Sequence, residues 1–405
     1  MVIQEINPEF IPGAKIKVLW VGGCGNKAID RMISEWLEWV TFVAINTDAQ
    51  DLAKSFAQKK LNIGLNLTKW LWAGANPEIG RKAAEESETD IKAMLQDTDM
   101  VFITCGMWGW TGTWAAPVIA NVAKAMGILT VAIITKPFSF EGRRRLASAD
   151  EWIAKMKDAV DTLIVIPNDK IFNVIDKKTS FKQAFTMIDK ILYLGVQWIS
   201  DLIIKPGDIN IDFADVKAVM TNSWNALLGI WYGAGEKRAV EAARKAIENP
   251  LLETNLDWAK NIIFAVSGWH DLTPAEVREA ADIIEQIIDP DVNFFRWMTF
   301  DEAYEDEVKV TIIATWFQEQ SSEEILKKPQ RDILWRPTVR KEAENFITRV
   351  VKSDSNREEN EYTQMNNSIN FEEKEEEITK QPSEDTETPA FLRRSLNKEN
   401  NTQSM

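Results

Sequence analysis

The first 170 residues alternate short apolar runs with longer amphipathic segments, and this alternation constrains the fold more than any other feature of the chain. The apolar runs have the length of buried strands, and the segments between them have helical spacing. The expected strands are 15–21, 40–46, 100–104, 128–134 and 161–166, and the expected helices are 26–35, 78–95, 115–126 and 148–159. This order predicts an α/β fold with a doubly wound parallel sheet, which binds its ligand at the carboxyl ends of the strands.

Loops rich in glycine and threonine follow two of these strands. The longest, residues 105–117, joins strand 100–104 to the next expected helix, and glycine turn 22–25 follows the first strand. Glycine leaves backbone N–H groups accessible, and with the hydroxyls of Thr111 and Thr113 and a helix N-terminus they form an anion cradle without a basic side chain. No GxxxxGK[ST] run occurs in the sequence, so a P-loop of that type is excluded. We expect phosphate to bind at these loops.

Two groups of charged residues are candidates for ligand contact or catalysis. Glu141 and Arg145 follow strand 128–134 and have the chemistry to hold ribose hydroxyls and phosphate, although a solvated surface turn explains them equally well. Asp212 and Asp215 are three residues apart at an expected helix start, so both can face one way and orient a water molecule. The alternative for this pair is a helix N-cap followed by a first-turn acid.

The remaining chain divides into three parts. An amphipathic helix at 179–204 is long enough to be a central helix between two subdomains. A second α/β unit follows, with strands near 225–232, 261–267, 292–298 and 308–314 and helices near 236–248 and 273–288. From about residue 318 the core pattern stops, and the polar composition of 351–386 predicts disorder. Within this tail, residues 389–394 (PAFLRR) form an apolar and basic island that is typical of a docking peptide.

Composition excludes several classes of function. A net charge of −15 without a basic stripe argues against a nucleic-acid partner. Two cysteines and a single histidine argue against a disulfide framework, a histidine metal cluster and a serine–histidine triad. No apolar run is long enough to span a bilayer, and the first ten residues lack the pattern of a signal peptide. We therefore expect a cytoplasmic protein without direct membrane insertion.

Taken together, the loops resemble those of a known family. The matching segments are Thr111-Gly112-Thr113, 44–48 (AINTD), 74–80 (GANPEIG), 136–142 (KPFSFEG) and 210–216 (NIDFADV). With these segments the chain resembles the tubulin-like bacterial cell-division GTPases of the FtsZ family over nearly all of residues 15–317 and again at the island in the tail. The resemblance implies an enzyme that hydrolyses GTP and assembles head-to-tail into filaments, with the acidic loop of one subunit completing the site of the next.

The resemblance also implies roles for individual residues. GTP or GDP would be held by Gly22, Gly23, Gly25, Asn26, Gly74, Ala75, Gly106, Met107, Gly109, Thr111, Gly112, Thr113, Glu141, Arg145, Asn168, Phe185 and Asp189. In this set Glu141 and Arg145 contact ribose, and Asn168, Phe185 and Asp189 read or stack on guanine. Asn210, Asp212 and Asp215 would position the attacking water in the neighbour's site, and Mg²⁺ would be held through the phosphates rather than by side chains.

The implied organisation and partners follow the same family. The boundaries are a flexible arm at 1–14, a GTP-binding subdomain at 15–178, the central helix and catalytic loop at 179–222, a C-terminal α/β subdomain at 223–317, a mostly disordered linker at 318–386, and a docking peptide and tail at 387–405. The partners would be further copies of the chain and membrane-anchoring division adaptors, which bind Pro389 to Arg394. The protein would then work in the cytoplasm at the division site.

Tryptophan is the one residue that departs from the family pattern. Sixteen of the 17 tryptophans stand where the family has glycine: Trp20, Trp36, Trp39, Trp70, Trp72, Trp108, Trp110, Trp114, Trp152, Trp198, Trp224, Trp231, Trp258, Trp269, Trp297 and Trp316. The two residues are opposite in volume and backbone freedom, so no physical pressure exchanges one selectively for the other. We interpret the pattern as a UGA codon that the source reads as glycine.

Two other functions remain open from the sequence. If the tryptophans are real, the chain is a structural paralogue with a blocked nucleotide pocket, although Asp212 and Asp215 argue against this. A dinucleotide-dependent dehydrogenase rests only on the incomplete glycine fingerprint at 20–25 and on analogy of fold.

Overall fold

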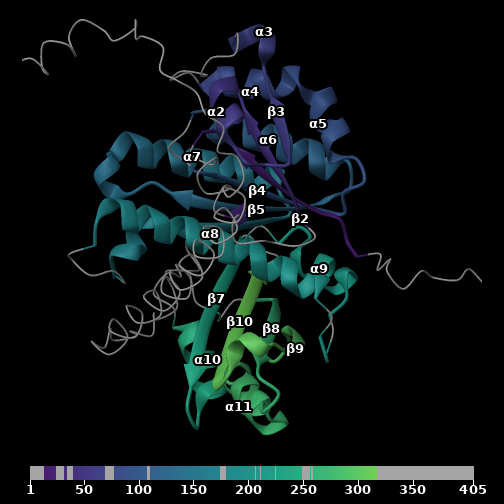
Figure 1. Cartoon of the computed structure of the whole chain (residues 1–405), viewed down its shortest axis with the longest axis vertical. Helices are drawn as coiled ribbons and strands as arrows, with labels where there is room; N and C mark the ends of the chain where they lie inside the picture. The colour runs from purple at the N-terminus through teal and green to yellow at the C-terminus, as the bar shows by residue number, and fades with distance from the viewer. Residues whose placement is uncertain are drawn as a thin grey trace, which may run out of the picture. The chain divides into compact units, whose positions relative to one another are not determined.

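A computed structural model describes residues 13–23, 32–33, 40–68, 77–106, 110–173, 179–205, 207–209, 211–223, 225–248, 256 and 259–316. Six parallel strands form the first sheet, in the order β3-β2-β1-β4-β5-β6. They are β1 (Ile16–Val21), β2 (Val40–Asn46), β3 (Lys59–Asn62), β4 (Met100–Gly106), β5 (Leu129–Lys136) and β6 (Thr162–Pro167). The order places the strand connections on both sides of β1, so the predicted doubly wound parallel sheet is confirmed (Figure 1).

Helices cover both faces of this sheet. One face carries α4 (Pro77–Glu86), α5 (Glu88–Leu95), α6 (Trp110–Ala125) and α7 (Arg143–Ala159), and α2 (Ala49–Lys54) and α3 (Leu65–Thr68) flank β3. The core under α6 and α7 contains apolar side chains of β1, β4 and β5, because these strands alternate their side chains between the two faces. The opposite face of β5 receives α8 (Phe181–Ile204), where a Cβ added at Gly195 would lie 3.3 Å from Ile133 Cδ1.

The structure corrects several predicted elements. The expected helix 78–95 is two helices that meet at Ser87, whose backbone leaves helical geometry with ψ of 16°. Helix α6 begins at Trp110 rather than 115, and α7 begins at Arg143 rather than 148. Strand β3 and helix α2 were not predicted, because β3 lies at the sheet edge with partly exposed side chains and shows no apolar run. Expected helix 26–35 lies mostly outside the described residues.

Helix α8 is the predicted central helix. Its N-terminus is fixed by a capping box, in which the Ser180 hydroxyl accepts from the Gln183 N–H and the Gln183 side chain accepts from Ser180 N–H. The helix has 24 residues, and at 1.5 Å per residue this corresponds to about 36 Å. It therefore connects two distant ends of the first sheet.

The second sheet has four strands, in the order β7-β10-β8-β9. They are β7 (Asn225–Ala234), β8 (Asn261–Gly268), β9 (Asn293–Phe300) and β10 (Glu307–Trp316), with β10 antiparallel to β7 and β8, and β8 parallel to β9. Helices α10 (Arg238–Ile247) and α11 (Pro274–Glu285) pack on it, and the short helix α9 (Phe213–Met220) precedes β7. The predicted second α/β unit is confirmed, with strand ends shifted by one to three residues.

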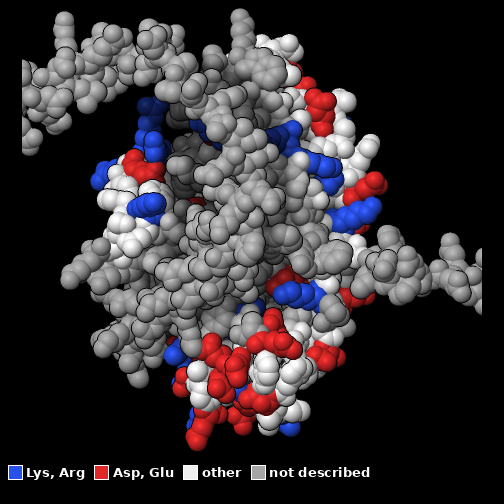
Figure 2. Space-filling view, viewed as in Figure 1, with Lys and Arg blue, Asp and Glu red and all other residues white. Residues whose placement is uncertain are grey.

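Two buried features hold α10 and α11 together. The Arg238 guanidinium pairs with Asp271 at 3.0 Å and with Glu276 at 2.9 Å, and these partners raise the pKa of Arg238. Acidic side chains gather over the region that Figure 1 assigns to α10 and α11, as Figure 2 shows. Such a surface repels nucleic-acid phosphates. Among the described residues, no helix combines the length and apolarity needed to cross a membrane.

Candidate functional site

Glycine permits close backbone contacts at the carboxyl edge of the first sheet. Gly22 follows β1 with φ of 90°, and its N–H donates to the Ile45 carbonyl at 2.8 Å. A Cβ added at Gly112 would lie 2.6 Å from the Val21 carbonyl oxygen, so only glycine lets α6 approach β1 this closely. Gly106 is the last residue of β4, and Gly23 follows Gly22. The edge is therefore shaped by main chain, as a phosphate site requires.

The first turn of α6 faces this edge. Because the helix begins at Trp110, Thr111, Gly112 and Thr113 lie in its first turn and not in a preceding loop, which corrects the prediction. The first four N–H groups of a helix have no intrahelical acceptor and carry the positive end of the helix dipole. This position is more favourable for an anion than the predicted loop.

Three buried polar side chains at the same edge have no hydrogen-bond partner among the described residues. They are Thr104 and Thr135, near the ends of β4 and β5, and Asn168, directly after β6. Asn168 is 0% exposed, and neither its amide nitrogen nor its carbonyl oxygen is paired. Because buried polar groups are almost always satisfied, this edge has the chemistry of a site that is completed by a polar ligand.

Thr104 and Thr135 were missed by sequence reasoning. The signal was a lone hydroxyl near the end of each apolar run, which sequence alone does not distinguish from an ordinary strand residue. Asn168 begins the short helix η2 (Asn168–Asn173), which contacts the start of α8. The fit of these residues to a nucleotide therefore rests on unpaired amide and hydroxyl groups beside a glycine-lined helix terminus.

Glu141 and Arg145 contact each other. Arg145 Nη1 lies 2.7 Å from Glu141 Oε2, and Glu141 Oε1 accepts from the Phe138 N–H at 2.9 Å. The Glu141 carboxylate is largely buried, whereas Arg145 is exposed. Glu141 ends the short helix η1 (Ser139–Glu141), and Arg145 lies in the first turn of α7. The pair is thus held at the carboxyl end of β5, which is the predicted position for ribose contact.

Phenylalanine rings gather beside Asn168. Phe138 is fully buried, and its ring centroid lies 4.9 Å from that of Phe140, 5.1 Å from Phe172 and 5.5 Å from Phe185. Phe185, on α8, meets Phe138 edge-on and stays partly exposed. Asp189 lies one turn further along α8, so it shares the helix face of Phe185. This face offers an aromatic surface and a carboxylate to a planar base.

Asp212 and Asp215 lie at the other end of α8. Asp212 is the N-cap of α9, and its Oδ1 accepts from the N–H groups of Ala214 and Asp215, at 2.5 and 3.1 Å. The N-cap alternative is thereby confirmed, and it leaves the second oxygen of Asp212 exposed to solvent with no hydrogen bond to the described residues recorded for it. Both carboxylates are separated from Asn168 and Phe185 by most of the length of α8. They cannot reach the nucleotide edge of their own chain.

Several predicted site residues lie outside the described residues. These are Gly25, Asn26, Gly74, Ala75, Met107, Gly109 and Asn210. The remaining predicted site residues therefore form two groups, one at the carboxyl edge of the first sheet and one at the start of α9.

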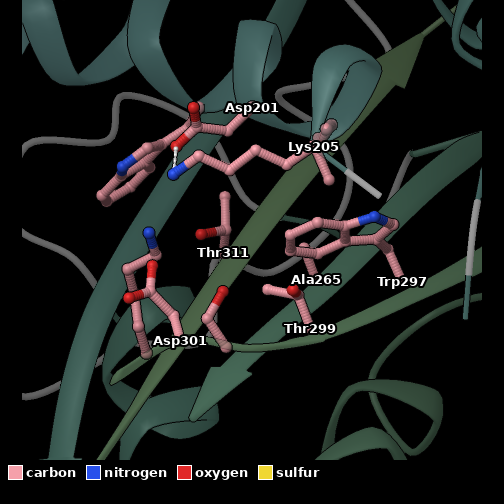
Figure 3. Close-up of a pocket in the computed structure, with 11 residues that line it drawn as sticks. Asp201, Lys205, Ala265, Trp297, Thr299, Asp301 and Thr311 are labelled. Atoms are coloured by element: carbon pink, nitrogen blue, oxygen red, sulfur yellow. Dashed lines mark ion pairs between the residues drawn. The ribbon is translucent and has the colours of Figure 1, made fainter. Parts of the chain in front are cut away.

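A polar pocket between α8 and the second sheet was not predicted. Asp201 and Lys205 of α8 form an ion pair of 3.2 Å on one side, and Trp297, Thr299 and Thr311 line the other side (Figure 3). Burial raises the pKa of Asp201. Such a pocket depends on residues far apart in the sequence, so periodicity does not reveal it.

Lys309 of β10 is buried in this pocket. Its ammonium donates to Tyr304 Oη at 2.9 Å and lies 4.7 Å from the centre of the Trp198 ring. Burial lowers the pKa of Lys309 and raises the pKa of Tyr232 and of Tyr304.

Four indole N–H groups are buried without a partner in the described residues, those of Trp20, Trp114, Trp152 and Trp297. Trp20 lies in β1 and Trp152 in α7, and both are almost completely buried. A buried indole N–H normally finds an acceptor. The unpaired indoles are therefore poorly suited to their surroundings.

Comparison with known proteins identifies the family. The model of the Tubulin/FtsZ family GTPase domain matches residues 15–176, and the model of the FtsZ family C-terminal domain matches residues 225–318. Two structures of FtsZ from M. jannaschii, one of them an empty dimer, are each 46% identical with a TM-score of 0.70, covering 75% of this chain and 89% and 91% of theirs.

Two more distant structures share the fold. They are the GDP-bound monomer of CetZ1 from Haloferax volcanii, at 19% identity, TM-score 0.61 and coverage of 74% of this chain and 93% of that one, and the GTPgS-bound protofilament of CetZ2, at 16%, 0.62, 77% and 96%. A GTPase domain and an FtsZ C-terminal domain thus occur in the expected order in one chain. The chain belongs to the FtsZ family of tubulin-like GTPases.

Proposed function

We propose that this chain is a self-assembling GTPase of cell division, which hydrolyses GTP where two subunits meet in a head-to-tail filament. The observation that carries the proposal is the separation of the two groups of site residues. The unpaired Asn168 and the glycine-lined N-terminus of α6 lie at one end of α8, and Asp212 lies beyond the other. A second copy that stacks end to end brings the two groups together, and such a contact does not close, so a filament forms.

In this proposal the first group binds GTP. Phosphates occupy the N-terminus of α6 and the glycine turn after β1, ribose contacts Glu141 and Arg145, and guanine meets Asn168 against Phe185. The nucleotide would satisfy the unpaired Asn168 amide. Mg²⁺, held through the phosphates, would neutralise their negative charge.

The second group acts on the neighbour's nucleotide. The exposed oxygen of Asp212 accepts a hydrogen bond from the attacking water, and Asp215 faces the same side of α9 one turn later. Phosphoryl transfer needs mainly positioning and charge neutralisation, so carboxylates that orient water suffice without a lysine or histidine base. Turnover then requires assembly.

The tryptophans bear on which sequence does this. We propose that glycine occupies the sixteen positions in the native protein, because unpaired indoles at Trp20, Trp114 and Trp152 conflict with their buried surroundings. No comparison supports the alternative of a nucleotide-free paralogue. Residues 389–394 would dock on a membrane-anchoring adaptor and so place the filament at the division site.

Light scattering and phosphate release with GTP test the proposal. The printed chain and its sixteen-glycine version are compared, each full length, with Asp212→Ala in whichever version turns over GTP. We expect GTP-dependent assembly in the glycine version, and assembly without turnover in Asp212→Ala. Failure of both versions to bind GTP contradicts the GTPase assignment, and normal turnover in Asp212→Ala contradicts the split site.

A further inference from the structure

The C-terminus of α9 is held by side chains from both sheets. The last four carbonyls of a helix have no intrahelical donor. In α9 the Met220 carbonyl accepts from the Thr162 hydroxyl of β6, and the Val219 carbonyl accepts from the Thr315 hydroxyl of β10 at 2.9 Å. The Ser223 hydroxyl also donates to Val219, at 2.6 Å. All three hydroxyls are buried.

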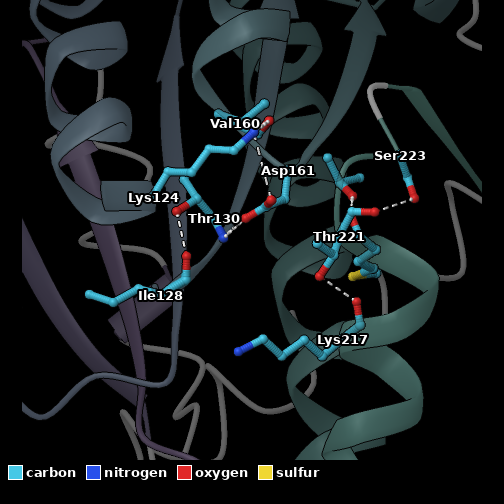
Figure 4. Close-up of polar contacts among 10 residues, drawn as sticks. Lys124, Ile128, Thr130, Val160, Asp161, Lys217, Thr221 and Ser223 are labelled. Atoms are coloured by element: carbon cyan, nitrogen blue, oxygen red, sulfur yellow. Dashed lines mark hydrogen bonds and ion pairs between the residues drawn. The ribbon is translucent and has the colours of Figure 1, made fainter. Parts of the chain in front are cut away.

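On the side of the first sheet, the clamp continues through main chain. The Ser223 N–H donates to the Asp161 carbonyl at 2.8 Å, and the Asp161 carboxylate accepts from the Thr130 N–H at 2.9 Å. Figure 4 shows Asp161 between Thr130 and the loop that carries Ser223. The Lys124 ammonium lies 3.8 Å from the Asp161 carboxylate. The end of α9 is therefore fixed to β5 and β6.

On the side of the second sheet, the clamp continues through a row of polar side chains. Thr315, Asn261 and Asn293 are register partners across β10, β8 and β9. Asn261 donates to Thr315 Oγ1 at 3.2 Å, and Asn293 donates to Asn261 Oδ1 at 2.8 Å. Each group in the row thus orients the next one, and Thr315 is left to donate to α9.

The segment before α9 is attached to the second sheet as well. The N–H groups of Asp208 and Ile209 lie 3.0 and 3.3 Å from the Met298 carbonyl of β9, and the Met298 N–H donates back to the Ile209 carbonyl at 3.2 Å. Residues 208–220 are therefore held at both ends by the second sheet, with Asp212 and Asp215 between the two attachments.

We infer that Thr162 and Thr315 are positioning residues for GTP hydrolysis, which set the place of Asp212 through the end of the helix that it caps. The inference rests on the proposed function of Asp212. A helix of eight residues has little freedom between its ends, so a shift at Met220 moves the N-cap. The second sheet thereby controls turnover in the neighbouring subunit, although neither hydroxyl touches the nucleotide.

Valine substitutions test the inference, because valine has the shape of threonine but lacks the hydroxyl. In the full-length chain that turns over GTP, we expect Thr315→Val and Thr162→Val to lower kcat by roughly tenfold with unchanged KM and unchanged GTP binding. Thr315→Ser restores the hydroxyl and should restore kcat. Thr130→Val is the matched control, since its buried hydroxyl donates to the Ile128 carbonyl and not to α9; its kcat should stay unchanged.

Mixed filaments separate positioning from a general folding defect. Thr315→Val subunits keep an intact GTP site but present a displaced Asp212, whereas Gly112→Ala subunits lose the GTP site and keep an intact Asp212. Mixing the two should give turnover above the sum of the separate samples. The inference is overturned if Thr315→Val turns over like wild type, if Thr315→Ser stays as slow as valine, or if the mixture shows no gain. If Asp212→Ala also turns over normally, the proposed function has failed instead.

Discussion

The hydroxyls of Thr162 and Thr315 come from different sheets and donate to successive carbonyls, Met220 and Val219, at the end of α9. Each substitution to valine leaves a buried carbonyl with one donor fewer, which costs about 1 kcal/mol of unfolding free energy. Because both hydroxyls hold the same helix end, we expect the two costs not to add in the double variant. Urea unfolding of the two single variants and the double variant measures this coupling, and strict additivity would show that the two contacts are independent.

Asn168 should decide base selectivity. Its amide is completely buried and unpaired among the described residues, so Asn168→Ala removes both groups that can bond a base and should weaken GTP binding by roughly tenfold or more. Phe181→Ala is the matched control, because this exposed ring contacts Phe140 and not Phe138 or Asn168. Titration with a fluorescent GTP analogue measures both variants. Equal weakening in the two variants would remove Asn168 from the site.

Lys309 should make stability depend on pH. Burial lowers its pKa from the ordinary value of 10.5. Between the lowered pKa and 10.5 the unfolded chain binds more protons than the folded chain, so the free energy of unfolding rises with pH in this window. Lys309→Met should remove that rise, and Lys260→Met, at an exposed lysine, should keep it. Melting temperatures between about pH 7 and about pH 9.5 provide the comparison.

The groups that face Lys309 do not cancel this effect. They are Asp201 and Lys205 on α8, Tyr232 on β7, and Asp301 and Tyr304 beside β10. Burial raises the pKa of both tyrosines above 10.0, so they lose protons only beyond the tested window, where they reduce stability. A melting temperature of Lys309→Met that still climbs with pH as wild type does would assign the dependence to another group.

The buried tryptophans give a chemical prediction. Mass spectrometry of the protein from its source should find glycine at positions 108 and 110, and tryptophan there would refute the codon interpretation. For the purified chains, we expect the sixteen-glycine version to unfold in a sharper transition, because each unpaired buried indole N–H costs about 1–3 kcal/mol. Calorimetry of both chains checks this, and a sharper transition in the tryptophan chain would contradict it.

The sequence predicts those elements that announce themselves by local pattern. The apolar runs of β1, β2 and β4 and the capping sequence of α11 are strong local signals, and the structure confirms all of them. The start of α6 was missed because glycine and threonine favour loops, while packing of Gly112 against Val21 makes a helix favourable there. Edge strand β3 was missed because it depends on pairing with β2.

The candidate site divides in the same way. Asp212 was predicted because its role as N-cap follows from neighbouring residues, and the structure confirms that cap. The row of Thr315, Asn261 and Asn293 could not be predicted, because it exists only when β8, β9 and β10 are placed in register. The same holds for Lys309, which interrupts an apolar strand and finds Tyr304 and Trp198 only in the folded chain.

The length of α8 also fixes a dimension of any filament that the chain forms. The helix has 24 residues, and the two half-sites lie at its opposite ends. For Asp212 of one subunit to reach the nucleotide of the next, the subunits must repeat at a spacing of at least about 36 Å, the length of this helix. Removing one helical turn from α8 would rotate and shorten the subunit together, so the axial period of the polymer and the alignment of its catalytic carboxylate are inherited from a single stretch of sequence.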